Sequence, residues 1–448
     1  MKLKTLVASC SIALFAHAAN ADSLLDVYQQ ALGNDAQLQA AKANFNANKE
    51  AKNLGLSALL PQVNASFTRT ESDVDQNDFD VATGNTDTTS ETTAVSLSQA
   101  LFNLPAWHNY KAGAVYANLA EARYKYDQQD LIIRVAEAYF GVLSAQARLT
   151  SARAEEKAIE RQLEQTMQRF EVGLIPITDV HEARAAYDLA VVARLAEEGS
   201  LDIAKEALTV LTGRDNANLS TLSDSFEASV PSPQDPTQWV NWATENNALL
   251  QVSKFSVDGA KRSADAARAR HLPTARVDMG WSDSKVSGDS FGQALDRAND
   301  GNSISFRVDV PLFAGGGTSA ARRQAYQEYL SALENHKLAQ RNTTKFTRSQ
   351  YISVTTGAAA VKARAQAITS AKSALEATQA GYDVGTRNVV DVLNAQKNLY
   401  RSQRDYANAR HDFVVNVLKL RLQAGLLDEQ DVRTLDQQMT AVSSASLN

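Results

Sequence analysis

Three short motifs in this 448-residue chain have residue types that catalyse reactions or hold ions in other proteins. Gly288-Asp289-Ser290-Phe291-Gly292 matches the G-x-S-x-G turn of nucleophilic serines, but a strand is expected after it and the motif requires a helix. Residues 73–84 are as acidic as a calcium loop, yet they lack Gly at position six and Glu at position twelve. Gly315-Gly316-Gly317 is not followed by the Lys-Ser/Thr pair of a phosphate-binding loop. None of the three motifs therefore predicts an active site.

Residue types that bind metals and cofactors are scarce. The single cysteine, Cys10, lies near the N-terminus, only three methionines follow Met1, and the five histidines after residue 22 have no ligand spacing. No nucleophile, base and orienting group converge in a recognisable pattern. We therefore expect no metal site, no cofactor and no enzymatic activity.

The N-terminus is typical of an exported protein. Lys2 and Lys4 precede an apolar run, and Ala19-Asn20-Ala21 matches a small-x-small cleavage site, so we predict a signal peptide over 1–21. Its removal leaves 43 basic and 51 acidic residues, a net charge of −8. Such an acidic chain is poorly suited to binding nucleic acid through the phosphates. After residue 22 the sequence has no run of about 18 apolar residues, so it predicts no transmembrane helix.

The chain contains an internal duplication. Phe170-Glu171-Val172-Gly173 recurs as Tyr382-Asp383-Val384-Gly385, and Asp179-Val180 recurs as Asp391-Val392, each 212 positions later. Matches at one offset across most of a chain indicate two copies of one unit. The expected organisation is a first repeat over 22–213, a linker over 214–237, a second repeat over 238–436 and a disordered tail over 437–448.

Each repeat is expected to begin with two helices, followed by a strand, a polar loop, a second strand, a long helix, a turn and a last helix. Proline-free stretches rich in helix formers predict long helices over 106–170 and 318–382, each 65 residues and roughly 100 Å long. Shorter helices are expected over about 179–213 and 388–425. Alternating apolar and polar residues predict strands over about 62–70, 92–102, 274–282 and 303–313, joined by polar loops over 71–92 and 283–302.

The turns between the paired helices have recognisable capping residues. Gly173 and Gly385 are suited to end the long helices in the left-handed conformation. Asp179 and Glu182 resemble a capping box at the start of the next helix. These residues either only cap the helices or, if the helices form a tube, also make polar contacts that close its far end, where Tyr382, Arg387 and Asp391 crowd the second turn.

Two structures fit the alternating strands: a small soluble sheet packed on helices, or a lipid-facing barrel. Four strands cannot close a barrel alone, because about eight is the practical minimum. If the strands span a membrane, several chains must contribute them. Three chains would give 12 strands around a water-filled interior, and the long helices would extend it as a tube.

The sequence resembles the outer-membrane factor family, the channels of tripartite efflux and type I secretion systems. The resemblance covers Asp22 to Leu435 and is most specific at Gln168-Arg169-Phe170-Glu171-Val172-Gly173-Leu174, Ile177-Thr178-Asp179-Val180 and Gly381-Tyr382-Asp383-Val384-Gly385-Thr386-Arg387. It implies a mixed α and β homotrimer, in which a 12-stranded transmembrane β-barrel continues into a 12-helix α-barrel of coiled coils. The barrel would contact outer-membrane lipid, and the helices would lie in the periplasm.

The implied function is a passive duct for drugs, toxic compounds or exported proteins. Its implied partners are a periplasmic adaptor and an inner-membrane transporter of the RND, ABC or MFS type. The gate at the periplasmic helix ends would use polar links among Thr178, Asp179, Tyr382 and Arg387, with Gln165 nearby as a candidate adaptor or pump contact. It would open when the inner coil, residues 318–423, swings outward.

The channel entrance departs from the family pattern. Two acidic rings are the rule in the family, and the corresponding residues here are Asp391 and Asn394. Three chains would therefore supply three carboxylates at this constriction, where six are usual. The resemblance thus implies weaker block by multivalent cations than a two-ring entrance shows.

Two alternatives remain. A coiled-coil periplasmic adaptor or surface structural protein would explain the long helices, but not four alternating strands at fixed positions in a repeat. A metal-efflux duct of the same fold is disfavoured by the scarcity of Met and His.

Overall fold

The computed structural model describes residues 22–76, 84–216, 218–290 and 293–440, so the expected signal peptide lies outside the described residues. The chain divides into two compact units. One comprises residues up to Gln39, Gln128–Glu245 and the chain from Lys345 onward; the other comprises Ala40–Asp127 and Asn246–Thr344. Two long helices contribute residues to both units, which are described separately below.

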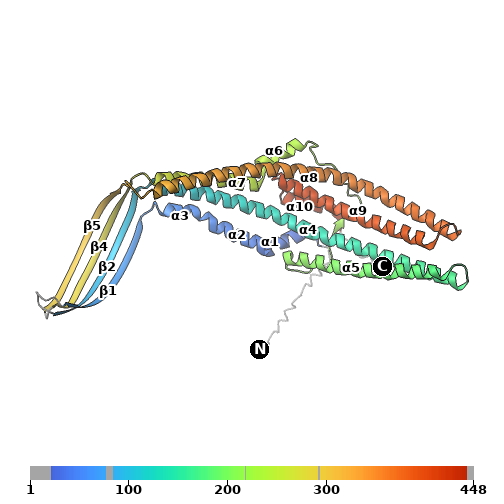
Figure 1. Ribbon diagram of the computed structural model, residues 1–448, viewed down its shortest axis with the longest axis horizontal. Helices are drawn as coiled ribbons and strands as arrows, with labels where there is room; N and C mark the ends of the chain where they lie inside the picture. The colour runs from blue at the N-terminus through green and yellow to red at the C-terminus, as the bar shows by residue number, and fades with distance from the viewer. Residues whose placement is uncertain (1–21, 77–83, 217, 291–292, 441–448) are drawn as a thin grey trace, which may run out of the picture. The chain divides into compact units, whose positions relative to one another are not determined.

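The two repeats have the same order of elements: helices, two strands, a long helix and a shorter helix (Figure 1). The first repeat contains α1 (Leu24–Asn34), α2 (Ala36–Lys49), α3 (Ala51–Ser57), β1 (Gln62–Gln76), β2 (Gly84–Phe102), α4 (Leu104–Glu171) and α5 (Ile177–Thr212). After the short strand β3 (Thr221–Leu222), the second contains α6 (Pro236–Asn246), α7 (Ala248–Ala269), β4 (Thr274–Ser290), β5 (Gln293–Asp309), α8 (Gly317–Asp383) and α9 (Val389–Gln423). The chain then forms α10 (Glu429–Asp436) and β6 (Met439–Thr440).

The long helices α4 and α8 are 68 and 67 residues long and begin slightly before the stretches expected from proline spacing. Helix α4 includes Pro105 in its first turn, where the missing N–H has no intrahelical partner to lose. Within the described residues, no helix has an apolar stretch long enough to cross a bilayer.

The four long strands form one antiparallel sheet in the order β1-β2-β4-β5, so the β2–β4 pair joins the two repeats. Val63, Leu97, Met279 and Ile304 lie directly opposite one another across it. Such rows make one face apolar near the helix-proximal strand ends, and that face is uncovered: Ile304 is 72% exposed. Strands β1 and β5 are the two edges of the sheet.

The strands extend well beyond the predicted alternation. The expected polar loops over 71–92 and 283–302 are mostly strand, since β1 and β2 pair from Gln62↔Ser98 to Gln76↔Gly84, and β4 and β5 pair as far as Ser290↔Gln293. These segments are rich in Thr, Ser and Asp on both faces, so they continue the hydrogen-bonded ladder without an apolar period.

One further strand prediction needs correction, and another is confirmed. Strand β5 ends at Asp309, short of the predicted residue 313, because Pro311 lacks the N–H that a ladder needs. The G-x-S-x-G motif lies where β4 ends at Ser290 and β5 begins at Gln293, so a strand follows it, as expected, where a nucleophile turn would need a helix. Its residues 291–292, like 77–83 of the calcium-like segment, lie outside the described residues.

The linker and the described part of the tail contain two short strands that the sequence did not predict. Within 214–237, strand β3 pairs antiparallel with β6, Thr221 opposite Thr440 and Leu222 opposite Met439, and Leu219 forms a bridge with Asp22. The prediction of disorder from residue 437 is therefore wrong for the residues up to 440. The sequence could not predict this pairing, because a two-residue strand is too short to show an alternation of apolar and polar residues.

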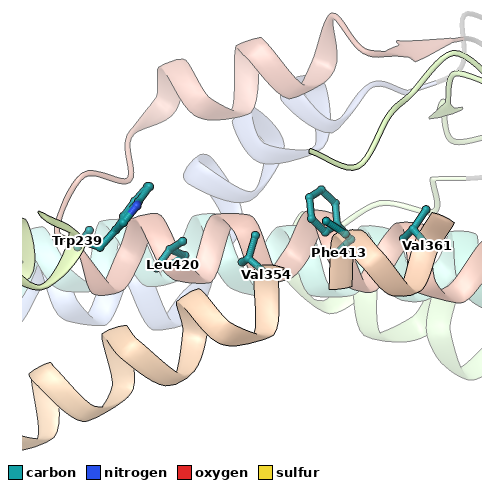
Figure 2. Close-up of a cluster of buried hydrophobic side chains, with 7 residues drawn as sticks. Trp239, Val354, Val361, Phe413 and Leu420 are labelled. Carbon is teal, nitrogen blue, oxygen red and sulfur yellow. The ribbon is translucent and has the colours of Figure 1, made fainter. Parts of the chain in front are cut away.

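A buried apolar cluster fastens α6 to α8 and α9 (Figure 2). Trp239 of α6, Val354 of α8, and Phe413 and Leu420 of α9 are all at most 4% exposed. Full burial of such a side chain contributes about 1.5–3 kcal/mol. This cluster holds the middle of the α8–α9 pair.

A buried ion pair ties the start of α2 to α4. The Arg134 guanidinium donates two hydrogen bonds to the Asp35 carboxylate, at 3.0 and 2.7 Å, and the same carboxylate accepts from the Leu38 amide at 2.8 Å. Asp35 thus caps α2 and neutralises Arg134. The hydrogen bonds from Arg134 lower the pKa of Asp35 below its usual value.

Asp35→Asn is expected to lower the free energy of unfolding by about 2 kcal/mol at neutral pH, because it retains the cap acceptor but removes the charge that pairs with Arg134. The folded-state pKa is lowered, so this stabilisation is present above the ordinary carboxyl pKa and is lost as pH falls through the folded value. Urea unfolding at several pH values measures it. Arg153→Gln, at an exposed ion pair with Glu198, is the control and should cost under about 1 kcal/mol; equal costs would contradict the assignment.

Candidate functional site

The two turns that join the paired helices have the same backbone geometry. Gly173 ends α4 with φ 74° and Gly385 ends α8 with φ 81°, the left-handed conformation. In each turn the amide after the glycine donates to the carbonyl five residues earlier, at 2.9 and 2.8 Å. This is the Schellman arrangement, so the prediction of left-handed glycine caps is confirmed.

The helix that follows the second turn has a complete capping box. The Asn388 side chain accepts from the Asp391 amide at 2.8 Å, and the Asp391 carboxylate accepts from the Asn388 amide at 3.4 Å. Arg387 also lies 3.8 Å from the Asp391 carboxylate. Asp391, for which the resemblance implied a place at the entrance constriction, is therefore engaged by its own turn.

The first turn lacks this cap. Pro176 occupies the N-cap position of α5 and provides no side-chain hydrogen bond. Asp179 lies at the third helical position, two residues inside a helix that begins at Ile177, so the predicted capping box of Asp179 with Glu182 is wrong. The neighbouring Thr178 hydroxyl donates to the Asp179 carboxylate at 3.4 Å. Pro176 provides no capping side chain at the position where Asn388 caps α9 in the second repeat.

Tyr382, near the end of α8, is 4% exposed. Its ring belongs to an apolar cluster with Ile159 of α4, Ala190 of α5 and Val389 and Val392 of α9. Its buried hydroxyl has no hydrogen-bond partner among the described residues. Tyr382 therefore joins the two helix pairs through its ring, whereas the sequence resemblance implied a polar link.

Arg169 provides the charged link between the two helix ends. Its guanidinium lies 3.1 Å from the Asp383 carboxylate and 4.5 Å from the centre of the Tyr382 ring. Arg169 lies in one of the family-specific motifs, but the sequence did not predict this role for it. The available signal was a pair of opposite charges, Arg169 and Asp383, beside the equivalent aromatic positions Phe170 and Tyr382 of the two repeats.

The other predicted gate residues are not brought together across the turns. Arg387 is exposed and pairs with Asp391 of its own helix end, and the Thr178 hydroxyl donates to its neighbour Asp179. Gln165 on α4 and Asn394 on α9 are exposed. Among the described residues, no group of three or more His, Cys, Asp or Glu side chains is placed to hold a metal ion.

The profile of outer membrane efflux proteins matches residues 27–214 and 239–426, two segments displaced by the 212 residues of the repeat. The chain belongs to the outer membrane efflux protein family. The outer membrane protein TolC of Vibrio cholerae is 37% identical over 433 residues, 96% of this chain and 97% of that protein. The alkaline protease secretion protein AprF of Pseudomonas aeruginosa is 32% identical over 96% of this chain and 90% of its own length.

Solved structures show the same fold. The outer membrane protein VceC from Vibrio cholerae aligns with a TM-score of 0.75 over 90% of this chain and 96% of that one, at 20% identity. As a member of the outer membrane efflux protein family, the chain is an outer-membrane channel for efflux and secretion. The adaptor and surface-protein alternatives are not favoured by these relatives.

Tyr382→Ala is expected to accelerate amide hydrogen exchange severalfold across residues 384–388, because the ring anchors this turn to α4 and α5. Tyr382→Phe should leave the exchange unchanged, since the hydroxyl has no partner to lose. Exchange measured by mass spectrometry on the detergent-solubilised protein separates the two variants. A Phe variant as labile as the Ala variant would show that the hydroxyl, and not the ring, holds the turn.

Proposed function

We propose that three copies close into a ring, with a 12-stranded barrel in the outer membrane and a 12-helix barrel in the periplasm. Strand β5 of one copy would pair with β1 of the next. This junction joins the second strand of one repeat to the first strand of another, as the β2–β4 pair does within the chain. Strand directions alternate across β1-β2-β4-β5, so the new pair is antiparallel as well.

Exposed apolar surfaces support this ring. The uncovered face of the sheet, which includes Phe67 and Phe306 at 67% and 66% exposure, suits lipid. On α5, Leu189, Ala196, Ile203 and Val210 recur every seven residues and are exposed, which is the spacing of a coiled-coil seam. A second copy of this chain would cover that seam.

The ring would act as a passive duct. We assign the supply of energy and the choice of cargo to an inner-membrane transporter of the RND, ABC or MFS type, joined by a periplasmic adaptor. The relative AprF is named for protease secretion, which supports exported proteins as one cargo class beside drugs and toxic compounds. Gln165, exposed on α4, is the proposed adaptor or pump contact.

The gate would lie at the two turns, and burial of the Tyr382 ring would hold it more strongly than charge. The Arg169–Asp383 pair is partly exposed, at 33% and 53%, so it contributes at most about 1 kcal/mol per chain. Burying an aromatic ring contributes about 2 kcal/mol. Opening would withdraw Tyr382 from its cluster, and Thr178, Asp179 and Arg387 would serve contacts between neighbouring copies.

Tyr382→Ala, Arg169→Ala and Arg387→Ala should each enlarge the single-channel conductance in planar bilayers, and Tyr382→Ala should have the largest effect, a severalfold increase. The physical reason is the loss of the buried ring or of the Arg169–Asp383 pair and, for Arg387→Ala, of the proposed contacts between neighbouring copies. Tyr382→Phe is the matched control and should conduct like the wild type. If all variants give wild-type steps, the gate lies elsewhere in the duct.

Asn394→Asp should tighten block by a trivalent cation such as La³⁺ by about tenfold or more, because three added carboxylates around the axis attract the ion. Block is read from the current at increasing La³⁺ concentration. Gln168→Glu adds the same charge on the exposed surface of α4 and is the control. Equal tightening in both variants would show that Asn394 does not line the constriction.

A further inference from the structure

A groove between the end of α7 and the start of α8 concentrates positive charge. Its volume is about 460 Å³, and its lining includes Lys261, Asp265, Arg268, Arg322, Arg323 and Tyr326. Four cations therefore face one carboxylate. All four cationic side chains are exposed, and none forms an ion pair with a described residue of this chain. Like charges gathered this closely favour binding of an anion.

The groove lies beside the apolar part of the sheet. Helix α7 ends five residues before β4, and Arg322 lies five residues into α8, about 7 Å along the helix axis. Immediately before α8, Leu312 and Phe313 are 92% and 88% exposed. The change from exposed apolar to exposed basic residues thus occurs within about ten residues of chain.

An aromatic and basic pair occurs at the same end of the unit. Trp107, in the first turn of α4, is 43% exposed, and the Lys111 ammonium lies 5.0 Å from the centre of its ring. Half-exposed tryptophans with neighbouring lysines are typical of a membrane–water interface. The headgroup layer there is roughly 5–8 Å deep, which matches the distance of Arg322 from the helix start.

We propose that this groove binds the phosphate group of an anionic phospholipid in the inner leaflet of the outer membrane. The proposal rests on the proposed function, because it requires the sheet to lie in the bilayer. The guanidinium forks of Arg268 and Arg322 provide paired donors for phosphate oxygens, and Lys261 and Arg323 add charge. The bound lipids would fix the depth of the channel in the membrane.

The test is titration of the intact, detergent-solubilised protein with phosphatidylglycerol or phosphatidylcholine, followed by native mass spectrometry. The wild type should prefer phosphatidylglycerol. Arg268→Gln/Arg322→Gln should lower that affinity roughly 25-fold, about fivefold per cation, and leave phosphatidylcholine binding unchanged. Arg341→Gln/Arg348→Gln removes two exposed cations elsewhere on α8 and should stay within about twofold of the wild type.

Arg268→Lys/Arg322→Lys keeps the charge and should retain most of the preference, which separates a binding effect from a folding defect. The proposal is overturned if the groove variant keeps wild-type affinity, if the control loses as much as the groove variant, or if inorganic phosphate competes at equal concentration. A further outcome also overturns it: Arg268→Gln/Arg322→Gln dissociates into single chains but binds lipid as the wild type does. Arg268 and Arg322 would then serve a contact between subunits.

The failure of this inference can be told apart from the failure of the proposed function. Conductance of the wild type and of the Arg341→Gln/Arg348→Gln control is recorded in planar bilayers from the same preparations. Pores without a phosphatidylglycerol preference refute the lipid site alone. Inserted protein without pores refutes the channel architecture on which the site depends.

Discussion

A sheet with two free edges and an uncovered apolar face constrains everything else in this protein. Backbone N–H and C=O groups along β1 and β5 need partners, and side chains such as Ile304 need an apolar neighbour. The proposed ring closure in a bilayer would answer both needs, since neighbouring copies would pair the edges and lipid would cover the face. A dimer joined at one edge would still have two free edges, so only the closed ring removes them. In that ring, the helices that leave the sheet would be arranged around one axis.

The sequence predicted polar links at the two turns, but the buried Tyr382 ring makes the stronger contact. Tyr382 packs against Ile159 and Ala190, whereas the Arg169–Asp383 pair remains partly in water. Exposed ion pairs are screened by salt, and a buried aromatic ring is not. Charge at these turns is therefore better suited to selecting the register between helix ends than to holding them together.

Elements with a strong period or a special backbone requirement could be predicted. The repeat, the long helices and the left-handed Gly173 and Gly385 follow from residue spacing and from glycine's tolerance of positive φ. The outer halves of the strands could not be predicted, because their Thr- and Ser-rich faces lack an apolar alternation. The contacts of Arg169 and Tyr382 depend on which helix ends meet, and that information is tertiary. The capping box of Asp179 failed because Pro176 stands where Asn388 stands in the other repeat.

Because Pro176 stands where Asn388 stands in the other repeat, the two helix pairs differ in whether their turn supplies its own side-chain cap. The α8–α9 turn does, and the α4–α5 turn does not. The α8–α9 turn satisfies its own backbone: Asn388 and Asp391 cap one helix, and the Thr386 amide and hydroxyl both donate to the Gly381 carbonyl that ends the other. In the proposed gating, this hairpin would keep these hydrogen bonds when it leaves its neighbours, and only the packing of Tyr382 against α4 and α5 would be lost. The α4–α5 turn has no side-chain cap at Pro176. Because its backbone is less well satisfied, this turn is better suited to stay packed against its neighbours. The two copies of the hairpin therefore differ. In the proposed gating, α8–α9 would move with its capped turn intact, and α4–α5 would stay in place.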